Sequence, residues 1–352
     1  MNINLIVMKK LFFFLSLFLF VSCEELQGFL ERFPEYDGKI VKENLPIATE
    51  NVGLLEGLYC DSAYIVALDF RDDKSYSLFS TKTGKLLSRF GEIGKGHMEI
   101  PIGCEGSIYE NSFVIFDDET RFVAAYNLLV DSVNSKCDRI HQYKIDGAQL
   151  SQIIPLDNNT FVGMGTYKDC YQYFLFDKFN KVLDFAYEIY NASDNKFNTF
   201  GKFLSNQGKL VKHPKEAKFV GATKQSTNID FFSAENEKIK KIKSLRIGNP
   251  SFTQTEVMGM SRVIPTDASI NGFIDLCASD NYVFALYSED KLKVSSYRSN
   301  IILVFDWDGN EICKIDMNRY IYYIAVWKST LYTVEKDEKG RHIIKKYELD
   351  KL

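Results

Sequence analysis

The sequence predicts an all-β protein, a six-bladed β-propeller whose ring is closed by an N-terminal strand. The first observation is composition: the chain has 20 Tyr and 28 Phe, and aromatic residues are enriched in strands. The second is a repeated unit in which an apolar run ends in an aromatic residue, followed by a polar turn and another strand. The third is a spare strand-like segment, residues 39–47, ahead of the first unit.

The repeated unit occurs six times. Its clearest copy runs from Ile301 to Phe305, turns at 306–309 and continues from Glu311 to Ile315. A period near ~40–50 residues with about four strands is typical of propeller blades. An alternative reading of the same strands is a sandwich of unrelated hairpins. The aromatic residues that mark the six units are 47, 50, 56, 73 and 42 residues apart: Phe79, Tyr126, Phe176, Phe232, Phe305 and Tyr347.

The ends of the repeat predict how the ring closes. The sixth unit reaches Leu352 without a fourth strand, and residues 39–47 supply a strand-like segment without a unit. Pairing the two would remove a long exposed sheet edge between the first and last blades. We therefore assign residues 39–352 to the propeller.

The start of the chain has the pattern of a secretory signal. Lys9 and Lys10 precede eleven residues, 11–21, of which only Ser16 is polar, and the small residue Ser22 follows. A charged region, a short apolar region and a small cleavage-site residue define such a signal. Eleven helical residues cover only about half of a ~30 Å hydrocarbon core, too few to span it. We predict a signal peptide over 1–22 and a lipid-anchored tether over 23–38.

Cys23 directly follows the small residue, and this placement resembles a bacterial lipobox. The resemblance implies a lipid on the Cys23 thiol and an outer membrane-anchored lipoprotein, although Phe20 and Val21 replace the usual Leu and Ala or Ser. The alternative is an ordinary secreted protein. Glu24 and Glu25 resemble a surface-export signal, so periplasmic and surface-exposed locations both remain open.

Charge and motif content limit the chemistry. Removing residues 1–22 takes away Lys9 and Lys10, which leaves 41 basic and 47 acidic residues and a net charge of 41 − 47 = −6. This balance disfavours nucleic acid as a partner. The four histidines lack metal-ligand spacing, and G-x-S-x-G, P-loop and H-E-x-x-H motifs are absent from the sequence. We expect a monomer with no metal and no cofactor.

One loop, residues 89–101, carries a glycine-rich motif. It resembles the G-x-x-G-x-G-P-x-E loop of NHL-like and TolB-like six-bladed propellers, which follows the outer strand of a blade. His97 stands where Pro is usual. The resemblance implies a six-bladed propeller lipoprotein, with a structural role for the residues that match the motif: Gly91, Gly94, Gly96 and Glu99.

The turns after the marked aromatics are short, whereas the opposite connections are longer and charged. Function tends to lie in loops on a rigid scaffold, so we place a binding site on the long-loop side, near the ring axis. We expect non-catalytic binding of a glycan, peptide or protein; the alternative is a metal-dependent hydrolase or lyase, lactonase- or sugar-lyase-like. The candidate contacts come from the six long loops, and the alternative is that they are ordinary solvent-exposed loop residues. They are Arg71, Asp117, Tyr167, Lys224, Arg298 and Arg341.

Overall fold

The computed structural model describes residues 28–45, 47, 51–94, 96, 99–100, 104–129, 137–190, 193–194, 196–257, 260–292 and 297–352, with backbone only at 137–141, 260 and 261. The expected signal peptide and Cys23 lie outside these residues. In the part of the chain that is described, no helix is long and apolar enough to cross a bilayer.

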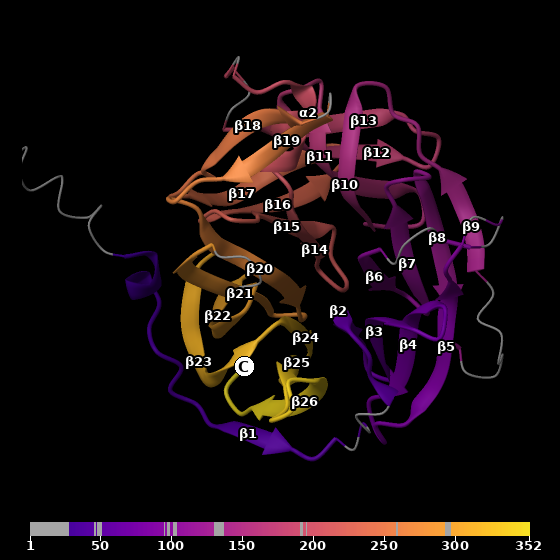
Figure 1. Cartoon of the computed structure of the whole chain (residues 1–352), viewed down its shortest axis with the longest axis vertical. Helices are drawn as coiled ribbons and strands as arrows, with labels where there is room; N and C mark the ends of the chain where they lie inside the picture. Colours follow the sequence, from indigo (N-terminus) through magenta and orange to yellow (C-terminus); the bar gives the residue numbers. More distant parts are fainter. Residues whose placement is uncertain are drawn as a thin grey trace, which may run out of the picture.

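Six four-stranded antiparallel sheets form a ring, as the propeller prediction required (Figure 1). Blade 1 contains β2 (Leu55–Cys60), β3 (Tyr64–Arg71), β4 (Lys74–Ser80) and β5 (Leu86–Glu92). Blade 2 contains β6 (Gly106–Tyr109), β7 (Ser112–Asp117), β8 (Phe122–Asn127) and β9 (Cys137–Gln142). Blade 3 contains β10 (Ala148–Pro155), β11 (Thr160–Tyr167), β12 (Tyr171–Asp177) and β13 (Val182–Glu188).

Blade 4 contains β14 (Gly208–Lys212), β15 (Lys218–Thr223), β16 (Asn228–Glu235) and β17 (Lys238–Arg246). Blade 5 contains β20 (Ile270–Ala278), β21 (Tyr282–Lys291), β22 (Ser299–Asp306) and β23 (Glu311–Ile321). Blade 6 contains β24 (Tyr323–Trp327), β25 (Thr330–Lys336), β26 (His342–Leu349) and, from the start of the chain, β1 (Ile40–Glu43). The first strands of successive blades are neighbours around the axis.

β1 is the outermost strand of blade 6. It pairs antiparallel with β26, in a register that places Ile40 opposite Leu349 and Glu43 opposite Lys346. The ammonium of Lys346 also lies 2.5 Å from the carboxylate of Glu43. The dependence of the ring on this pairing remains a prediction, and its test is given in the Discussion.

The core is divided into six apolar clusters, one at each joint between adjacent blades. This division follows from strand geometry, because successive side chains point to opposite faces of a sheet and both faces of each blade meet a neighbour. Each of the six marked aromatics lies on the third strand of its blade, is buried, and belongs to the cluster shared with the preceding blade.

Two insertions interrupt the regular repeat on the long-loop side. The hairpin of β18 (Phe252–Val257) and β19 (Met260–Pro265) joins blade 4 to blade 5, and it explains the 73-residue interval between Phe232 and Phe305. The short helix α2 (Thr199–Ser205) joins blade 3 to blade 4 and was not predicted. The backbone N–H of Asn198, its N-cap, donates to the Gln254 carboxamide of the hairpin at 2.9 Å, so the two insertions lie together.

Residues 28–38, expected to be part of a tether, pack against the ring. The 3-10 turn η2 (Phe29–Arg32) lies at the outer wall of blades 4 and 5 (Figure 1). Phe29 contacts Phe273 and Tyr287 edge-on, and Phe33 contacts Phe305. Phe29 and Phe33 are only 5% and 3% exposed, so this segment forms part of the folded domain.

Candidate functional site

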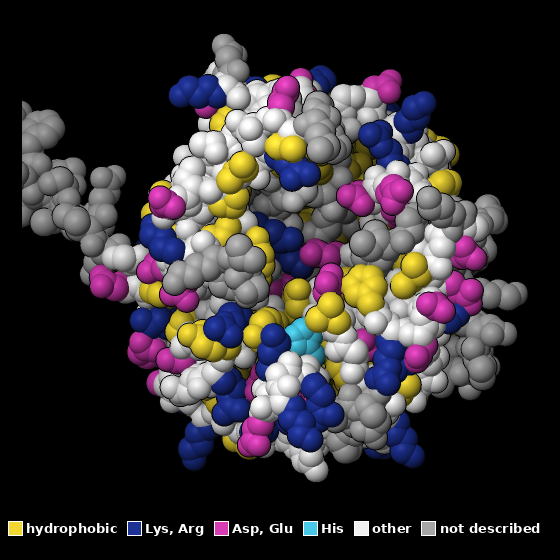
Figure 2. Space-filling view, viewed as in Figure 1, with side chains coloured by type: hydrophobic (Ala, Val, Ile, Leu, Met, Phe, Trp, Pro, Cys, Tyr) yellow, Lys and Arg dark blue, Asp and Glu magenta, His cyan; other side chains and the backbone are white. Residues whose placement is uncertain are grey.

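The axis of the ring contains two cavities that meet at Glu105 and Lys209. The short-turn cavity, about 640 Å³, is lined from every blade, for example by Tyr59, Ile108, Leu156, Lys212, Cys277 and Trp327. The long-loop cavity, about 620 Å³, lies under α2 and the β18–β19 hairpin. In the space-filling view the ring is hollowed at its centre, where dark blue and magenta side chains lie (Figure 2).

Lys209 on β14 bridges two acidic side chains between the cavities. Its ammonium lies 2.7 Å from the Glu105 carboxylate, which precedes β6, and 3.3 Å from Asp275 on β20. Lys224 approaches Glu105 from the long-loop side at 3.6 Å. We call these four residues the Lys209 cluster. It joins blades 2, 4 and 5 across the axis, because its members come from three different sheets.

The charges of this cluster are strongly coupled. Burial raises the pKa of Glu105, but Lys209 and Lys224 outweigh it and hold the pKa at about 2. Burial opposes the charge on Lys209, yet Glu105 and Asp275 raise its pKa well above the ordinary value. Burial keeps the pKa of Asp275 raised despite Lys209. Glu105 is therefore a carboxylate and Lys209 an ammonium at neutral pH, and the two form a charged pair.

Asn271 lines the long-loop cavity with a buried carboxamide that has no hydrogen-bond partner among the described residues. Its side chain is 1% exposed, and neither its carboxamide oxygen nor its carboxamide nitrogen has a hydrogen-bond partner among the described residues. Beside it, Gln225 donates to the Tyr297 hydroxyl at 2.9 Å, while its buried Oε1 has no partner there. Buried polar groups are nearly always satisfied, so two acceptors and one donor within the wall of a cavity call for a bound molecule.

The backbone around Asn271 fixes its position. The N–H of Gln225 donates to the Asn271 carbonyl at 3.2 Å, and Lys224 forms an isolated bridge with Gly272. Gly272 has φ of +63°, and a Cβ there would lie 2.4 Å from the backbone nitrogen of Ser226. Only glycine tolerates this conformation and this approach, so the first strand of blade 5 and the loop of blade 4 are held together.

The six sequence candidates share the long-loop side but do not gather in one cavity. All come from connections between the second and third strands of a blade, and only Lys224 lines the long-loop cavity. Arg298 stacks on Tyr320, and Arg341 pairs with Asp337 at 2.8 Å.

The remaining three candidates also have local contacts. Asp117 accepts hydrogen bonds within its own turn, from Glu119 N and Thr120 N. Arg71 donates to the Val52 carbonyl at 3.5 Å. Tyr167 packs on Phe174 and Phe185. Each of these contacts lies within a blade or beside it, away from the two axial cavities.

The glycine motif begins at the end of β5, the outer strand of blade 1, and continues into the connection that leaves it. Gly91 has φ of +74°, and a Cβ there would lie 2.6 Å from the Tyr76 ring. Glu99 accepts a hydrogen bond from the backbone N–H of Gly96 at 2.7 Å, and the N–H of Gly94 donates to the carbonyl of Ile100. The motif therefore shapes a connection and does not line either axial cavity.

The described residues contain no group of three or more His, Cys, Asp or Glu side chains that could hold a metal ion. The residues that sequence reasoning missed are Asn271, Glu105, Lys209 and Asp275. The signal for Asn271 was the Asn-Gly pair that opens an apolar strand. The other three carry no local signal. Lys209 is 104 residues from Glu105 and 66 from Asp275, and the sequence does not show that they meet at the axis.

Comparison with known proteins supports the fold. No curated protein matches the sequence. A Bacteroides fragilis protein described as exported shares 11% identity and a TM-score of 0.56, over 91% of this chain and 99% of its own. A duf4221 family member from Bacteroides vulgatus shares 11% identity and a TM-score of 0.56, over 90% of this chain and 99% of its own. At these identities the likeness shows the fold alone.

The family model described as TolB-like 6-blade propeller-like matches residues 59–329, which is more than half of the chain. This match confirms the resemblance seen at residues 89–101, and the six sheets agree with it. The chain therefore belongs to the TolB-like six-bladed propeller family.

Proposed function

We propose that this propeller is a non-catalytic binding module of the cell envelope that takes a neutral polar ligand in the long-loop cavity. The observation that carries the proposal is the buried, unpartnered carboxamide of Asn271. Removing an unsatisfied buried polar group costs a protein little or even stabilises it, so a folding role does not account for Asn271. A ligand that pairs with it does.

The cavity walls favour a glycan or a peptide. A carboxamide donates and accepts at once, as sugar hydroxyls and peptide groups require. Tyr297 and Tyr323 also line the cavity and offer ring faces to a sugar or a side chain. The cavity volume of about 620 Å³ lies within the range of ligand pockets, ~300–1,000 Å³.

The Lys209 cluster favours binding over metal-dependent catalysis. Glu105 and Asp275 are the channel carboxylates that a metal would use, and Lys209 lies within 2.7 and 3.3 Å of them. A fixed ammonium between the two neutralises the charge that would attract a cation. The hydrolase or lyase alternative would need Lys209 to move away from both carboxylates.

The proposed location is the outer membrane, through lipid on Cys23, with the ligand-binding face either periplasmic or surface-exposed. The support is the signal-like segment 1–22 and the small residue before the cysteine. The two or three acyl chains that the lipobox resemblance implies would make the anchor stable, because each buried CH₂ contributes ~0.8 kcal/mol.

A thermal-shift experiment tests the ligand proposal. The purified chain is melted alone and with the N-acetylglucosamine trimer, maltotriose or tetra-alanine. At a probe concentration 100-fold above Kd, binding adds about 2.7 kcal/mol, which for ~320 residues raises Tm by about 4 °C. We expect at least one probe to do so, and Asn271→Ala to remove the rise.

Two controls interpret the result. Asn300→Ala removes the same side chain from a surface pair with Asp316 and should keep the rise. Asn271→Ala without probe should melt no lower than the wild type, because its carboxamide has no partner to lose. A probe that stabilises wild type and Asn271→Ala equally would show that the ligand binds elsewhere.

A further inference from the structure

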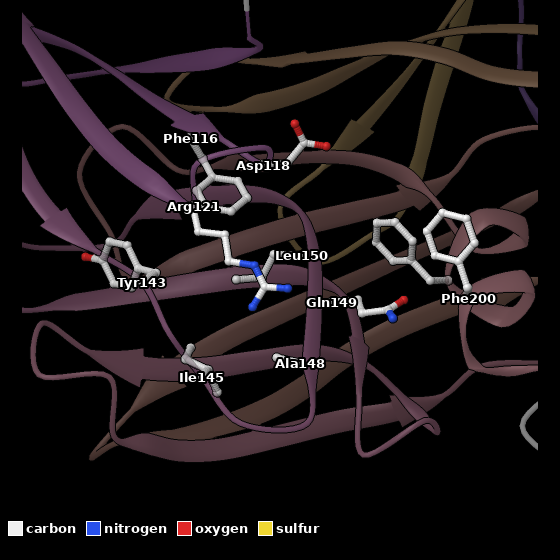
Figure 3. Close-up of a pocket in the computed structure, with 10 residues that line it drawn as sticks. Phe116, Asp118, Arg121, Tyr143, Ile145, Ala148, Gln149, Leu150 and Phe200 are labelled. Carbon is white, nitrogen blue, oxygen red and sulfur yellow. The ribbon is translucent and has the colours of Figure 1, made fainter. Parts of the chain in front are cut away.

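A second, smaller cleft lies away from the axis, between blades 2 and 3 and under α2. Its cavity is about 200 Å³. Phe116 of β7 and Tyr143 form one side, residues 148–150 of β10 form the floor, and Phe200 of α2 forms the far side (Figure 3). Phe203 of the same helix also lines the cleft. Leu204 and Ser205 of the same helix face the long-loop cavity, so α2 separates the two sites.

Arg121 places an unneutralised charge in this cleft. Figure 3 shows its guanidinium in the middle of the lining side chains. Asp118 also lines the cleft, yet within the described part of the chain the Arg121 side chain makes no ion pair or hydrogen bond. Its backbone is held at φ of +58°, with the carbonyl accepting from Tyr143 N at 2.8 Å. The loop therefore fixes the base of an exposed guanidinium, unpaired among the described residues, at the mouth of the cleft.

The cleft around Arg121 is mainly apolar, with Asp118 and Gln149 as the polar side chains beside it. Phe116 and Phe203 are 5% and 8% exposed, and Leu150 belongs to the same apolar cluster as Phe116. The Oε1 atom of Gln149 is buried there without a partner among the described residues. A guanidinium beside apolar walls binds a carboxylate strongly, because the site can be shielded from water and two parallel hydrogen bonds form.

The adjoining cavity limits the ligand's charge. It measures about 270 Å³, shares Arg121 and Gln149 with the cleft, and is lined further by Asp146 and Asp169. Lys144 lines the same cavity, so beyond Arg121 its two carboxylates outnumber its one ammonium and disfavour a second anionic group. The two cavities together leave room for a chain that continues past Arg121, while the 200 Å³ cavity is below the ~300 Å³ of typical ligand pockets. It suits a single side chain.

We propose that this Arg121 cleft binds a carboxylate next to an apolar group, as at the C-terminus of a peptide. The carboxylate pairs with the Arg121 guanidinium, and the last side chain packs against Phe116, Phe200 and Phe203. Rotation of the Gln149 carboxamide, whose Oε1 is buried and unpartnered among the described residues, lets it accept from the terminal amide N–H. A small free acid such as phenylacetate shares the carboxylate and apolar group but lacks the amide.

The test uses the mature chain and two fluorescein-labelled hexapeptide pools that end in Leu, Ile, Val or Phe. One pool has a free carboxylate and the other a C-terminal amide. Fluorescence anisotropy should show saturable binding of the acid pool and at least about tenfold weaker binding of the amide pool. Arg121→Gln should reduce the acid pool to the affinity of the amide pool, while Arg121→Lys keeps part of the difference.

Arg341→Gln is the matched control, since Arg341 lies on the same side but pairs with Asp337. It should bind as the wild type does. If phenylacetate displaces the labelled peptide, the site also binds small free acids. If it does not, the site is specific for peptides. Equal affinity for both pools, or no saturable binding up to about 1 mM, overturns the proposal. Arg121→Gln should melt like the wild type, because no partner of Arg121 is lost.

Discussion

Replacing Lys209 with Met should destabilise the propeller in a pH-dependent way. The substitution keeps an unbranched side chain one atom shorter but leaves Glu105 and Asp275 without their shared ammonium. The pKa of Glu105 is about 2 in the folded protein against an ordinary 4.5, a difference that corresponds to about 3 kcal/mol of stability. Breaking a buried ion pair by removing one partner typically costs ~3–5 kcal/mol. Because the Glu105 side chain keeps 30% exposure, we expect the lower end of that range.

The sign of the pH dependence follows from the direction of the shift. A carboxylate whose folded-state pKa is lowered contributes stability that is complete above its unfolded pKa and is lost as the pH falls towards the folded value. In the wild type this contribution is therefore full above pH 4.5 and declines towards pH 2. In Lys209→Met most of this contribution is lost, because only Lys224 remains to oppose the burial of the Glu105 carboxylate. The difference between the two proteins should be largest near pH 7 and should close below pH 4.5.

Urea unfolding between pH 3 and 7 measures this difference. Lys212→Met is the matched control, because Lys212 lies on the same strand but lines only the short-turn cavity, where it contacts Tyr109 and the Leu156 carbonyl. Equal free energies of unfolding for wild type and Lys209→Met at pH 7 would refute the buried ion pair. A difference that does not shrink at acid pH would refute the assignment of the charge to Glu105.

Three further predictions test the ends of the chain and the glycine motif. Cys23→Ala should release the protein into the soluble fraction of the envelope or leave it uncleaved; unchanged detergent partitioning and mass would contradict the lipid anchor. Deleting residues 39–47 should abolish cooperative melting, since β26 loses its partner strand, and an unaltered melting curve would show that the ring does not need it. Gly91→Ala should cost ~2–4 kcal/mol in urea unfolding from its positive φ and its contact with Tyr76, whereas Gly28→Ala, with 3.9 Å of clearance, should cost little.

The repeat was readable because each blade has the same packing requirement. An aromatic residue on the third strand fills the joint with the preceding blade, and Phe79, Tyr126, Phe176, Phe232, Phe305 and Tyr347 all do so. The local sequence is sufficient to recognise each blade, since one strand and the turn after it define the repeated unit. The same regularity identified the long-loop side, because strand order alone decides which connections share a side.

The radial position of a residue was not readable in this way. Arg71, Arg298 and Arg341 lie between second and third strands, too far out to line the axial cavities, whereas Glu105, Lys209 and Asp275 lie at first strands. In the sequence, a charged residue near an apolar run is indistinguishable from an ordinary strand boundary. Its role becomes visible only in the folded ring, where strands from three blades come together. The helix α2 was missed because its seven residues are too few for a helical period to be seen.

The docked segment at the start of the domain has a consequence for orientation. With lipid on Cys23, five peptide units reach Gly28, and at ~3.6 Å each this leash spans at most about 18 Å. A domain of ~320 residues is about 50 Å across. Phe29 and Phe33 are buried between blades 4 and 5, so the leash cannot lengthen without unpacking them. With that anchor the bilayer would face this wall, the ring axis would lie parallel to the membrane, and both mouths of the axial channel would open to solvent.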